Sequence, residues 1–305
     1  MPLQTDSLNR LASNSRVAVI RLRSLGDCVL STPAIHLLKR HRPDLKIAVV
    51  AEERFAGVYE NNPDVAEILR PSIGALRAFG PKMCVNLHGG TRSARLTALS
   101  GAKIRAGLDI FRPAWPYNVK IPTAQEILGI ARRVHTAEHQ ASTMFYLGVP
   151  VAEIPRAALY PDAGRSPFAP AGRYAVIHPF AATPEKTWPA QSFAAAAEAL
   201  DIEPVFVGGP ADDFTPFERW KNARGASLPQ LAQLLRDAAV FIGNDSGPAH
   251  VAAAFGIPCV VLFGPSDAEI WSPWRTQSEV LRGEPIGSIG VEQVLRAAAG
   301  KVWVL

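Results

Sequence analysis

Cysteine is scarce in this sequence of 305 residues: Cys28, Cys84 and Cys259 are far apart and form no CxxC pair. This spacing offers no disulfide framework, so we expect a protein of the reducing cytoplasm. Long apolar runs are missing too, since none approaches the roughly 20 residues of a membrane span. Residues 1–16 lack the apolar stretch of a secretory signal, so we predict no export. The 48% of hydrophobic residues still suffice for buried sheets, and the length suggests two domains.

Acidic residues are few in the first half of the chain. Residues 1–155 hold 20 Lys and Arg against 12 Asp and Glu, a net charge of +8, whereas residues 156–305 hold 12 against 15, a net charge of −3. This asymmetry indicates either an anionic partner for the first half or an ordinary solvated surface. The sequence has no long basic run and no nucleic-acid-binding motif, so we do not expect nucleic acid as a partner.

Short apolar runs alternate with helical patterns along the chain, which is typical of parallel sheets covered by helices on both faces. The predicted strands are 16–21, 46–50, 66–70, 83–87, 104–107, 174–178, 204–207, 240–242 and 259–263. The predicted helices are 28–42, 55–61, 91–99, 124–147, 189–199, 228–237, 247–255 and 291–299.

The alternation is interrupted once, by a stretch rich in Pro, Gly, Ala and Ser over residues 150–172. We therefore predict an α/β protein with two doubly wound, Rossmann-like domains, residues 1–155 and 173–305, joined by a linker over 156–172. Folds of this kind bind ligands at the carboxyl ends of their strands, so we expect the functional residues in the loops that follow the strands.

The most informative segment runs from Phe241 to Ser266, where a strand leads through Gly-Asn-Asp-Ser-Gly into a helix. The free N–H groups and the positive dipole end at a helix start suit a phosphate. Asp245 and Ser246 either cap this helix or face a ligand, and Asp245 can accept sugar hydroxyls. His250, one turn further on, either reaches the same ligand or is a helix histidine satisfied within the protein.

This segment resembles the nucleotide-sugar loop of glycosyltransferase family 9, the family of the ADP-heptose:lipopolysaccharide heptosyltransferases. Matching positions are Gly243, Asn244, Asp245, Ser246, Gly247, Pro248, His250, Ala252, Ala253, Gly256, Pro258, Leu262, Phe263, Gly264, Pro265, Trp271, Pro273 and Trp274. Further matches are Arg21–Asp27 with Leu30 and residues 32–34, Val85–Ala94, and His178-Pro179 followed by Lys186, Trp188 and Pro189. The resemblance covers roughly residues 16 to 300.

The resemblance implies a GT-B fold, in which two Rossmann-like domains face each other across a cleft and the last helix crosses back to the first domain. It implies an inverting glycosyltransferase that needs neither a metal nor a cofactor. The donor would be a nucleotide-diphosphate sugar of the ADP-heptose type, and the acceptor an anionic glycolipid, the lipopolysaccharide inner core. The enzyme would work in the cytoplasm, with peripheral contact at the inner membrane.

The resemblance also assigns roles to single residues. Asp27 would be the base that takes the proton of the acceptor hydroxyl, although an Asp at this point also suits a helix N-cap. Lys186 would stabilise the leaving diphosphate. Ala181 and Ala182 stand where characterised heptosyltransferases tend to have a pair of hydroxyl residues, so phosphate contacts are expected from Thr183 or from backbone N–H groups.

The remaining assignments depend on the context of each loop. Asp212 or Asp213 would accept ribose hydroxyls, or they simply close a solvated turn. The predicted donor site thus comprises Thr183, Lys186, Asp212, Asn244, Asp245, Ser246, Gly247 and His250. The predicted acceptor site comprises Arg54, His88, Arg92, Arg95 and Arg112, because guanidinium groups match carboxylates and phosphates. The basic run Lys39–Arg42 either faces a membrane or marks a helix end favoured by the dipole.

Three alternatives stay open. The same scaffold can use another nucleotide sugar or another acceptor. A sugar-nucleotide epimerase of similar fold would need no base at Asp27. A module that binds the nucleotide sugar without turnover is disfavoured, since Asp27, Lys186 and Asp245 are all present.

Overall fold

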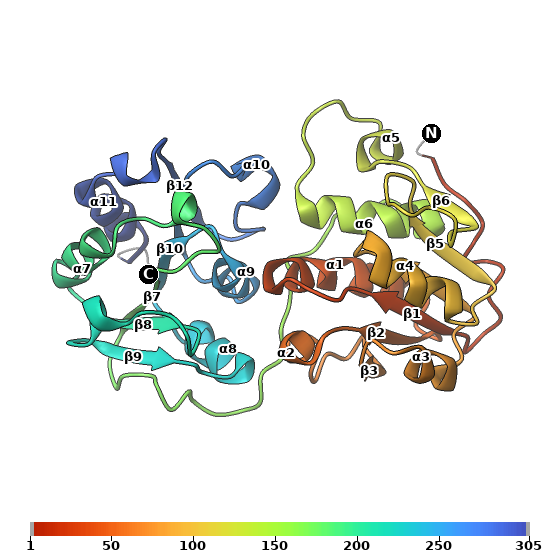
Figure 1. The fold of residues 1–305 in the computed structure, drawn as a ribbon, viewed down its shortest axis with the longest axis horizontal. Helices are drawn as coiled ribbons and strands as arrows, with labels where there is room; N and C mark the ends of the chain where they lie inside the picture. The colour runs from red at the N-terminus through yellow and green to blue at the C-terminus, as the bar shows by residue number, and fades with distance from the viewer. Residues whose placement is uncertain (1–2, 303–305) are drawn as a thin grey trace. The chain divides into compact units, whose positions relative to one another are not determined.

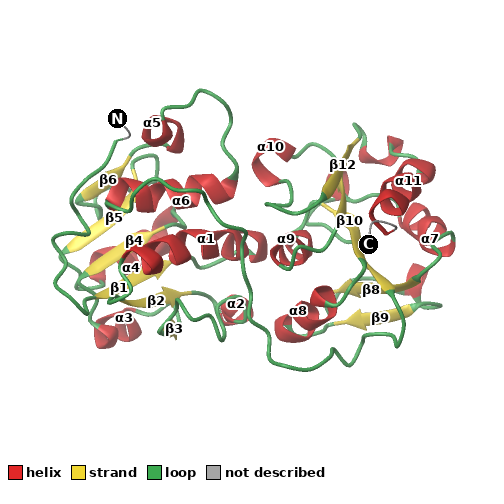
Figure 2. Cartoon of the chain, turned by 180° about the vertical axis from the view of Figure 1, so that it is seen from behind, coloured by secondary structure: helices red, strands yellow, loops and turns green. Residues whose placement is uncertain are grey.

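The structure, a computed structural model, describes residues 3–302 and divides into two compact units, Met1–Pro155 and Arg156–Leu305. Each unit contains one six-stranded parallel sheet with helices packed on it (Figures 1 and 2). This confirms the predicted architecture of two Rossmann-like, doubly wound α/β domains.

The first sheet has the strand order β3-β2-β1-β4-β5-β6. Its strands are β1 (Arg16–Ile20), β2 (Lys46–Val50), β3 (Glu67–Leu69), β4 (Met83–Asn86), β5 (Ile104–Leu108) and β6 (Val119–Ile121). Its helices are α1 (Leu25–His41), α2 (Glu53–Ala56), α3 (Ile73–Phe79), α4 (Gly90–Leu99), α5 (Ala124–Leu128) and α6 (Thr136–Leu147). The central strands are apolar because both of their faces are covered, and residues 17–20 and 47–50 have no exposed surface.

The second sheet repeats this topology, with the order β12-β11-β10-β7-β8-β9. Its strands are β7 (Tyr174–His178), β8 (Glu203–Gly208), β9 (Lys221–Arg224), β10 (Val240–Asn244), β11 (Cys259–Phe263) and β12 (Ser278–Arg282). Its helices are α7 (Ala190–Glu198), α8 (Leu228–Arg236), α9 (Gly247–Ala254), α10 (Ala268–Trp271) and α11 (Val291–Val302), with short 3-10 turns at Pro184–Lys186, Thr215–Phe217 and Ile286–Ser288.

In each unit the strand order reverses between the first and fourth strands, β1 and β4 in one and β7 and β10 in the other. The loops leaving the carboxyl ends of such a pair diverge to opposite faces and leave room for a ligand. Functional side chains are therefore expected directly after β1, β4, β7 and β10, where Asp27 in the first turn of α1, His88, Lys186 and Asp245 lie.

Several boundaries differ from the predictions. The predicted helix over 124–147 is two helices, because Gly129 ends α5 in the left-handed conformation at φ 66°. The predicted helix over 55–61 is wrong beyond Ala56, where the chain continues as turns. The strands β6, β9 and β12 were not predicted.

The stretch 156–172 forms no helix or strand, yet it packs on the second unit. Ala157 and Leu159 are buried. Gln233 and Arg236 of α8 donate hydrogen bonds to carbonyl groups of this stretch. At the other end of the unit, α11 packs against α7, β10, β11 and β12. The predicted return of this helix to the first domain stays a prediction.

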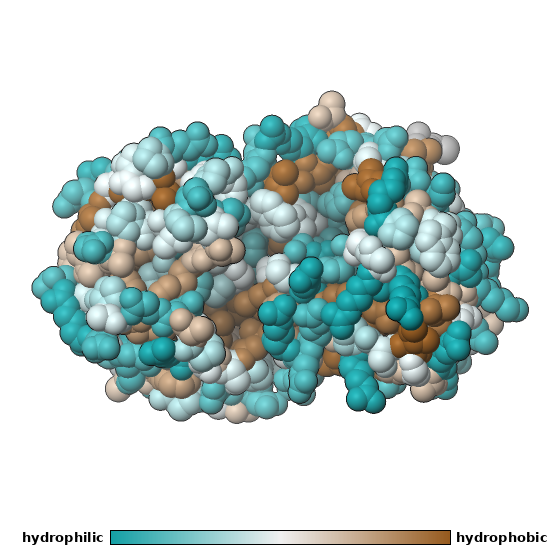
Figure 3. Space-filling model, viewed as in Figure 1, coloured by the Kyte–Doolittle hydropathy of each residue, from teal (hydrophilic) through white to brown (hydrophobic). Residues whose placement is uncertain are grey.

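Hydrophilic side chains occupy much of the face seen in Figure 3, and apolar side chains appear there in scattered patches. Within the described residues, no helix combines the length and the apolarity that crossing a bilayer requires.

Candidate active site

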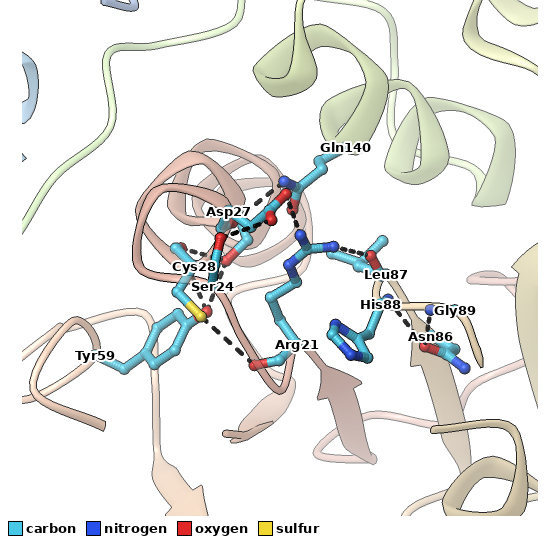
Figure 4. Close-up of polar contacts among 11 residues, drawn as sticks. Arg21, Ser24, Asp27, Cys28, Tyr59, Asn86, Leu87, His88, Gly89 and Gln140 are labelled. Atoms are coloured by element: carbon cyan, nitrogen blue, oxygen red, sulfur yellow. Dashed lines mark hydrogen bonds and ion pairs between the residues drawn. The ribbon is translucent and has the colours of Figure 1, made fainter. Parts of the chain in front are cut away.

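The first candidate half-site forms at the carboxyl end of β1, where Asp27 lies in the first turn of α1 (Figure 4). Ser24, not Asp27, is the N-cap residue of this helix, so the reading of Asp27 as the cap is wrong. One carboxylate oxygen of Asp27 pairs with the Arg21 guanidinium, and the other accepts a hydrogen bond of 3.0 Å from the Ser24 hydroxyl. The carboxylate is thus held in one orientation and keeps further lone pairs for a ligand.

Arg21 links this carboxylate to the neighbouring strand. Its Nη1 donates to the carbonyl of Leu87, directly after β4, while Nη2 meets Asp27. The residue is only 7% exposed. A buried guanidinium needs a counter-charge, so Arg21 and Asp27 depend on each other.

His88 follows β4 in a turn that is shaped by Asn86. The Asn86 side chain accepts hydrogen bonds from the backbone N–H groups of His88 and Gly89, at 2.9 and 3.2 Å, and donates to the Tyr117 hydroxyl at 2.8 Å. Burial, followed by the positive charges of Arg21 and Arg23, lowers the pKa of His88. The imidazole is therefore neutral at physiological pH.

The predicted acceptor arginines do not gather in one place. Arg54 and Arg92 share the carboxylate of Glu52, at 3.1 and 2.7 Å. Arg95 is exposed on α4, and Arg112 is exposed in the loop after β5, where it donates to the Asp109 carbonyl at 2.6 Å. The contacts that the structure gives for the described residues join Asp27, through Arg21, to the Leu87 carbonyl beside His88, and join Arg54 and Arg92 through Glu52.

The basic run at the end of α1 is partly used inside the fold. The Lys39 ammonium donates to the carbonyls of Pro43 and Leu45. Arg42 donates to the Leu8 carbonyl and makes a two-point contact with Asp44. Lys39 and Arg42 therefore stabilise the first unit, which weakens the hypothesis that this run is a membrane-facing patch.

The second candidate half-site forms at the carboxyl ends of β7 and β10. The Lys186 ammonium lies 3.3 Å from a carboxylate oxygen of Asp245. The Asp245 side chain is 9% exposed and that of Lys186 is 32% exposed, so the ammonium can still meet a ligand. A fixed cation at this edge is suited to phosphate.

Asn244 holds the two loops of this half-site together instead of facing a ligand. It has no exposed surface. Its amide oxygen accepts the backbone N–H of Trp188 at 3.0 Å, and its amide nitrogen donates to the Pro179 carbonyl at 2.9 Å. With both polar groups used inside the protein, the predicted donor contact from this side chain is replaced by a structural role.

A close backbone approach at Gly264 also positions the lysine. A methyl group on Gly264 would collide with the carbonyl oxygen of Glu185, the residue before Lys186. Only glycine lets the 3-10 turn of Lys186 pack against the end of β11. This gives a physical reason for the glycine in the Phe-Gly-Pro part of the motif.

The start of α9 is left open by its own N-cap residue. The Ser246 hydroxyl does not cap the helix but lies 3.0 Å from both His178 Nδ1 and the Asn244 carbonyl. Burial lowers the pKa of His178 to about 4, so the ring is neutral. Gly247 is the first helical residue, and the dipole of α9 places partial positive charge there.

The other predicted donor residues differ in exposure and in the contacts that they make. Thr183 is exposed at the start of the 3-10 turn. Asp212 accepts the Gly209 N–H at 2.7 Å and so closes the loop after β8, while Asp213 caps Thr215 in the same loop. His250 is only 4% exposed and lies against Trp271, with 6.5 Å between the ring centroids, so it occupies a packing position.

Sequence reasoning missed two residues of these half-sites. Arg21 belongs to the matching segment Arg21–Asp27, but no functional role was predicted for it. Gln140 of α6 had no signal in the sequence, yet its side chain reaches the backbone of Asp27. Among the described residues, no group of three His, Cys, Asp or Glu side chains suits a metal ion.

Comparison with known proteins finds relatives of one kind. The model of glycosyltransferase family 9 (heptosyltransferase) matches residues 73–289, more than half of the chain. The lipopolysaccharide heptosyltransferase 3 of Escherichia coli is 28% identical over 297 residues, which cover 83% of this chain and 84% of that protein.

Solved structures agree as well. The glycosyl transferase family 9 protein from Veillonella parvula DSM 2008 superposes with a TM-score of 0.83 at 25% identity, covering 95% of this chain and 97% of that one. The E. coli heptosyltransferase WaaC with ADP superposes with a TM-score of 0.75 at 19% identity, covering 94% and 99%. The same protein is also solved with ADP-2-deoxy-2-fluoro heptose.

Proposed function

Since the chain belongs to glycosyltransferase family 9, the heptosyltransferase family, we propose that it moves a heptose from an ADP-heptose-type donor onto a lipopolysaccharide inner-core acceptor. The transfer inverts the anomeric centre and requires no metal. The observation that carries this proposal is that each unit holds one suitable group at its topological switch point, a fixed carboxylate at Asp27 and a fixed ammonium at Lys186.

In the proposed reaction, an acceptor hydroxyl attacks the anomeric carbon of the donor. The new glycosidic C–O bond forms as the bond from that carbon to the diphosphate oxygen breaks. Asp27 takes the hydroxyl proton, and the diphosphate leaves with the electron pair of the broken bond. Arg21 and Ser24 support this role because they fix the direction of the carboxylate.

The donor is proposed to bind in the second unit. Lys186 and the N–H groups at the start of α9, at Ser246 and Gly247, neutralise the diphosphate, and Thr183 lies in the same loop as the lysine. Asp245 orients the ammonium, and Asp212 accepts ribose hydroxyls. An ADP donor is supported by the related E. coli protein, whose solved structures contain ADP and an ADP-heptose analogue.

The acceptor is proposed to bind in the first unit, which carries the +8 net charge. Arg54, Arg92, Arg95 and Arg112 contact its phosphates and carboxylates, and His88 lines the site near Asp27. We place the reaction in the cytoplasm, at the inner face of the inner membrane, where a lipid-linked acceptor is reached by peripheral contact.

A donor screen tests this function. Calorimetry compares ADP-heptose with GDP- and UDP-sugars, and the ligand that binds is then offered with heptose-deficient, de-O-acylated lipopolysaccharide. We expect ADP-heptose to bind and to yield a product one heptose heavier, with inverted anomeric configuration by NMR. Transfer from a GDP- or UDP-sugar alone, or epimerisation without transfer, would contradict the proposal.

Lys186→Ala tests the donor half-site. Loss of a charge-assisted contact is worth about 1.5–3 kcal/mol, so we expect the donor KM to rise about ten- to a hundredfold. Lys221→Ala, an exposed lysine on β9, is the matched control and should behave as wild type. An unchanged donor KM in Lys186→Ala would remove this lysine from the site.

A further inference from the structure

Three buried polar atoms around Asp27 lack a hydrogen-bond partner among the described residues: Arg21 Nε, His88 Nδ1 and Gln140 Oε1. Gln140 comes from α6 and is 3% exposed. In Figure 4 its side chain lies on one side of the Arg21–Asp27 pair and the His88 ring lies on the other. A buried polar atom without a partner costs free energy, so three of them around one carboxylate indicate groups that a ligand completes.

Two of the three atoms are hydrogen-bond acceptors. The amide of Gln140 is oriented by its Nε2, which donates to the backbone carbonyl of Asp27 at 3.2 Å, so its oxygen is the free end. Burial lowers the pKa of His88, so the ring is neutral, and Nδ1 is its nitrogen without a partner. A neutral ring donates through one nitrogen and accepts through the other, which makes Nδ1 the candidate acceptor.

Neutral acceptors select for a particular ligand chemistry. A phosphate or an ionised carboxylate has no proton to donate and gains nothing from an amide oxygen or an imidazole lone pair. A hydroxyl group can donate to either atom, and it can also accept from a donor such as Arg21 Nε. The polar atoms beside Asp27 therefore fit a polyhydroxylated ligand, not an anionic one.

We propose that Gln140 and His88 form a hydroxyl subsite beside Asp27, in which two hydroxyls of the acceptor sugar donate to Gln140 Oε1 and His88 Nδ1. The subsite rests on the proposed function and makes it more specific. The acceptor enters with a hydroxyl-rich ring toward Asp27, and its phosphates and carboxylates stay with the exposed arginines. Gln140 becomes a residue that determines acceptor specificity.

The test uses Gln140→Leu and His88→Phe, which keep the approximate shape and remove the acceptor atoms. Gln125→Leu on α5 and His36→Phe on α1 are matched controls, since His36 pairs with Asp64 at the surface. The acceptor is heptose-deficient, de-O-acylated lipopolysaccharide. A neutral hydrogen bond is worth about three- to tenfold in affinity, so we expect the acceptor KM to rise by that factor in each test variant. The controls, and ADP binding in all four variants, should match wild type.

A purely structural role gives a different result. Gln140→Leu also removes the bond to the Asp27 backbone, and if that bond were all that mattered, kcat would fall while the acceptor KM stayed unchanged. His88→Phe retains this bond, so it tests the subsite even if Gln140→Leu folds poorly by its melting curve. An unchanged acceptor KM in folded His88→Phe and Gln140→Leu would overturn the subsite.

Binding without turnover separates the subsite from the proposed function. Calorimetry of the same de-O-acylated acceptor with the ADP-saturated protein measures the subsite directly. If wild type binds the acceptor and both variants bind it more weakly, but no transfer occurs, the proposed function fails and the subsite stands. If wild type neither binds nor transfers to this acceptor, both are overturned.

Discussion

The substitution Asp27→Asn tests two roles of one carboxylate. Asp27 is the proposed base, and it is also the counter-charge of buried Arg21. Asparagine still offers an oxygen to Arg21, but it neither carries the charge nor takes a proton. If Asp27 is the base, turnover should fall on the order of a hundredfold or more. The melting temperature should also fall, which the sequence alone did not suggest.

The size of that second effect follows from the contact. A hydrogen bond to a charged group is worth about 1.5–3 kcal/mol and a neutral one about 0.5–1.5 kcal/mol, so the substitution costs about 1–2 kcal/mol. For a unit of this size, each kcal/mol lowers the melting temperature by about 2–4 °C, which gives about 2–8 °C.

Asp44→Asn is the matched control, because Asp44 makes a two-point contact with Arg42 just before the amino end of β2, away from the carboxyl ends of the strands. It should lose less stability, because this ion pair is more exposed, and keep full turnover. The assays are steady-state turnover with the donor and acceptor named above, calorimetry of ADP binding, and thermal melting by circular dichroism. Near-normal turnover in Asp27→Asn would refute the catalytic assignment, and an unchanged melting temperature would refute the dependence of Arg21 on this carboxylate.

Three further predictions concern other parts of the structure. Gly264→Ala should displace the turn that carries the candidate lysine, lower the stability by about 1–3 kcal/mol and raise the donor KM; full donor affinity would refute the packing argument. His178 has its pKa lowered to about 4 by burial, so the unfolded chain binds its proton first, and stability should fall as the pH drops from about 6.5 to 4, by up to about 3 kcal/mol. In His178→Asn this part of the acid sensitivity should vanish, as urea unfolding at several pH values will measure. Arg95→Glu should raise the acceptor KM, less so as salt rises, with ADP affinity unchanged; an insensitive KM would assign the basic first half to surface charge alone.

The central strands were predictable because strands covered on both faces are continuous apolar runs. The edges were not. β9 reads Lys-Asn-Ala-Arg and β12 is half-exposed and partly charged, so neither carries the apolar signal of a buried strand. Helix boundaries failed where single residues decide them, as at Gly129.

The candidate sites were predictable as positions but not as contacts. The motifs predicted that Asp27 and Lys186 follow buried strands, and the strand order of the structure shows which strands are neighbours. Nothing in the sequence distinguishes an amide that faces a ligand from one that joins two loops, which is why Asn244 was misassigned. Gln140 was missed because its partner lies 113 positions away in the sequence.

The pairing of Lys186 with Asp245 has a consequence for the end of the catalytic cycle. Cleavage of a sugar diphosphate leaves a terminal phosphate with one more negative charge than the donor had. If the diphosphate binds at Lys186 as proposed, that extra charge appears near a carboxylate that is already there. Asp245 would then oppose retention of the spent nucleotide, so the same ion pair that orients the lysine for the donor would hasten product release.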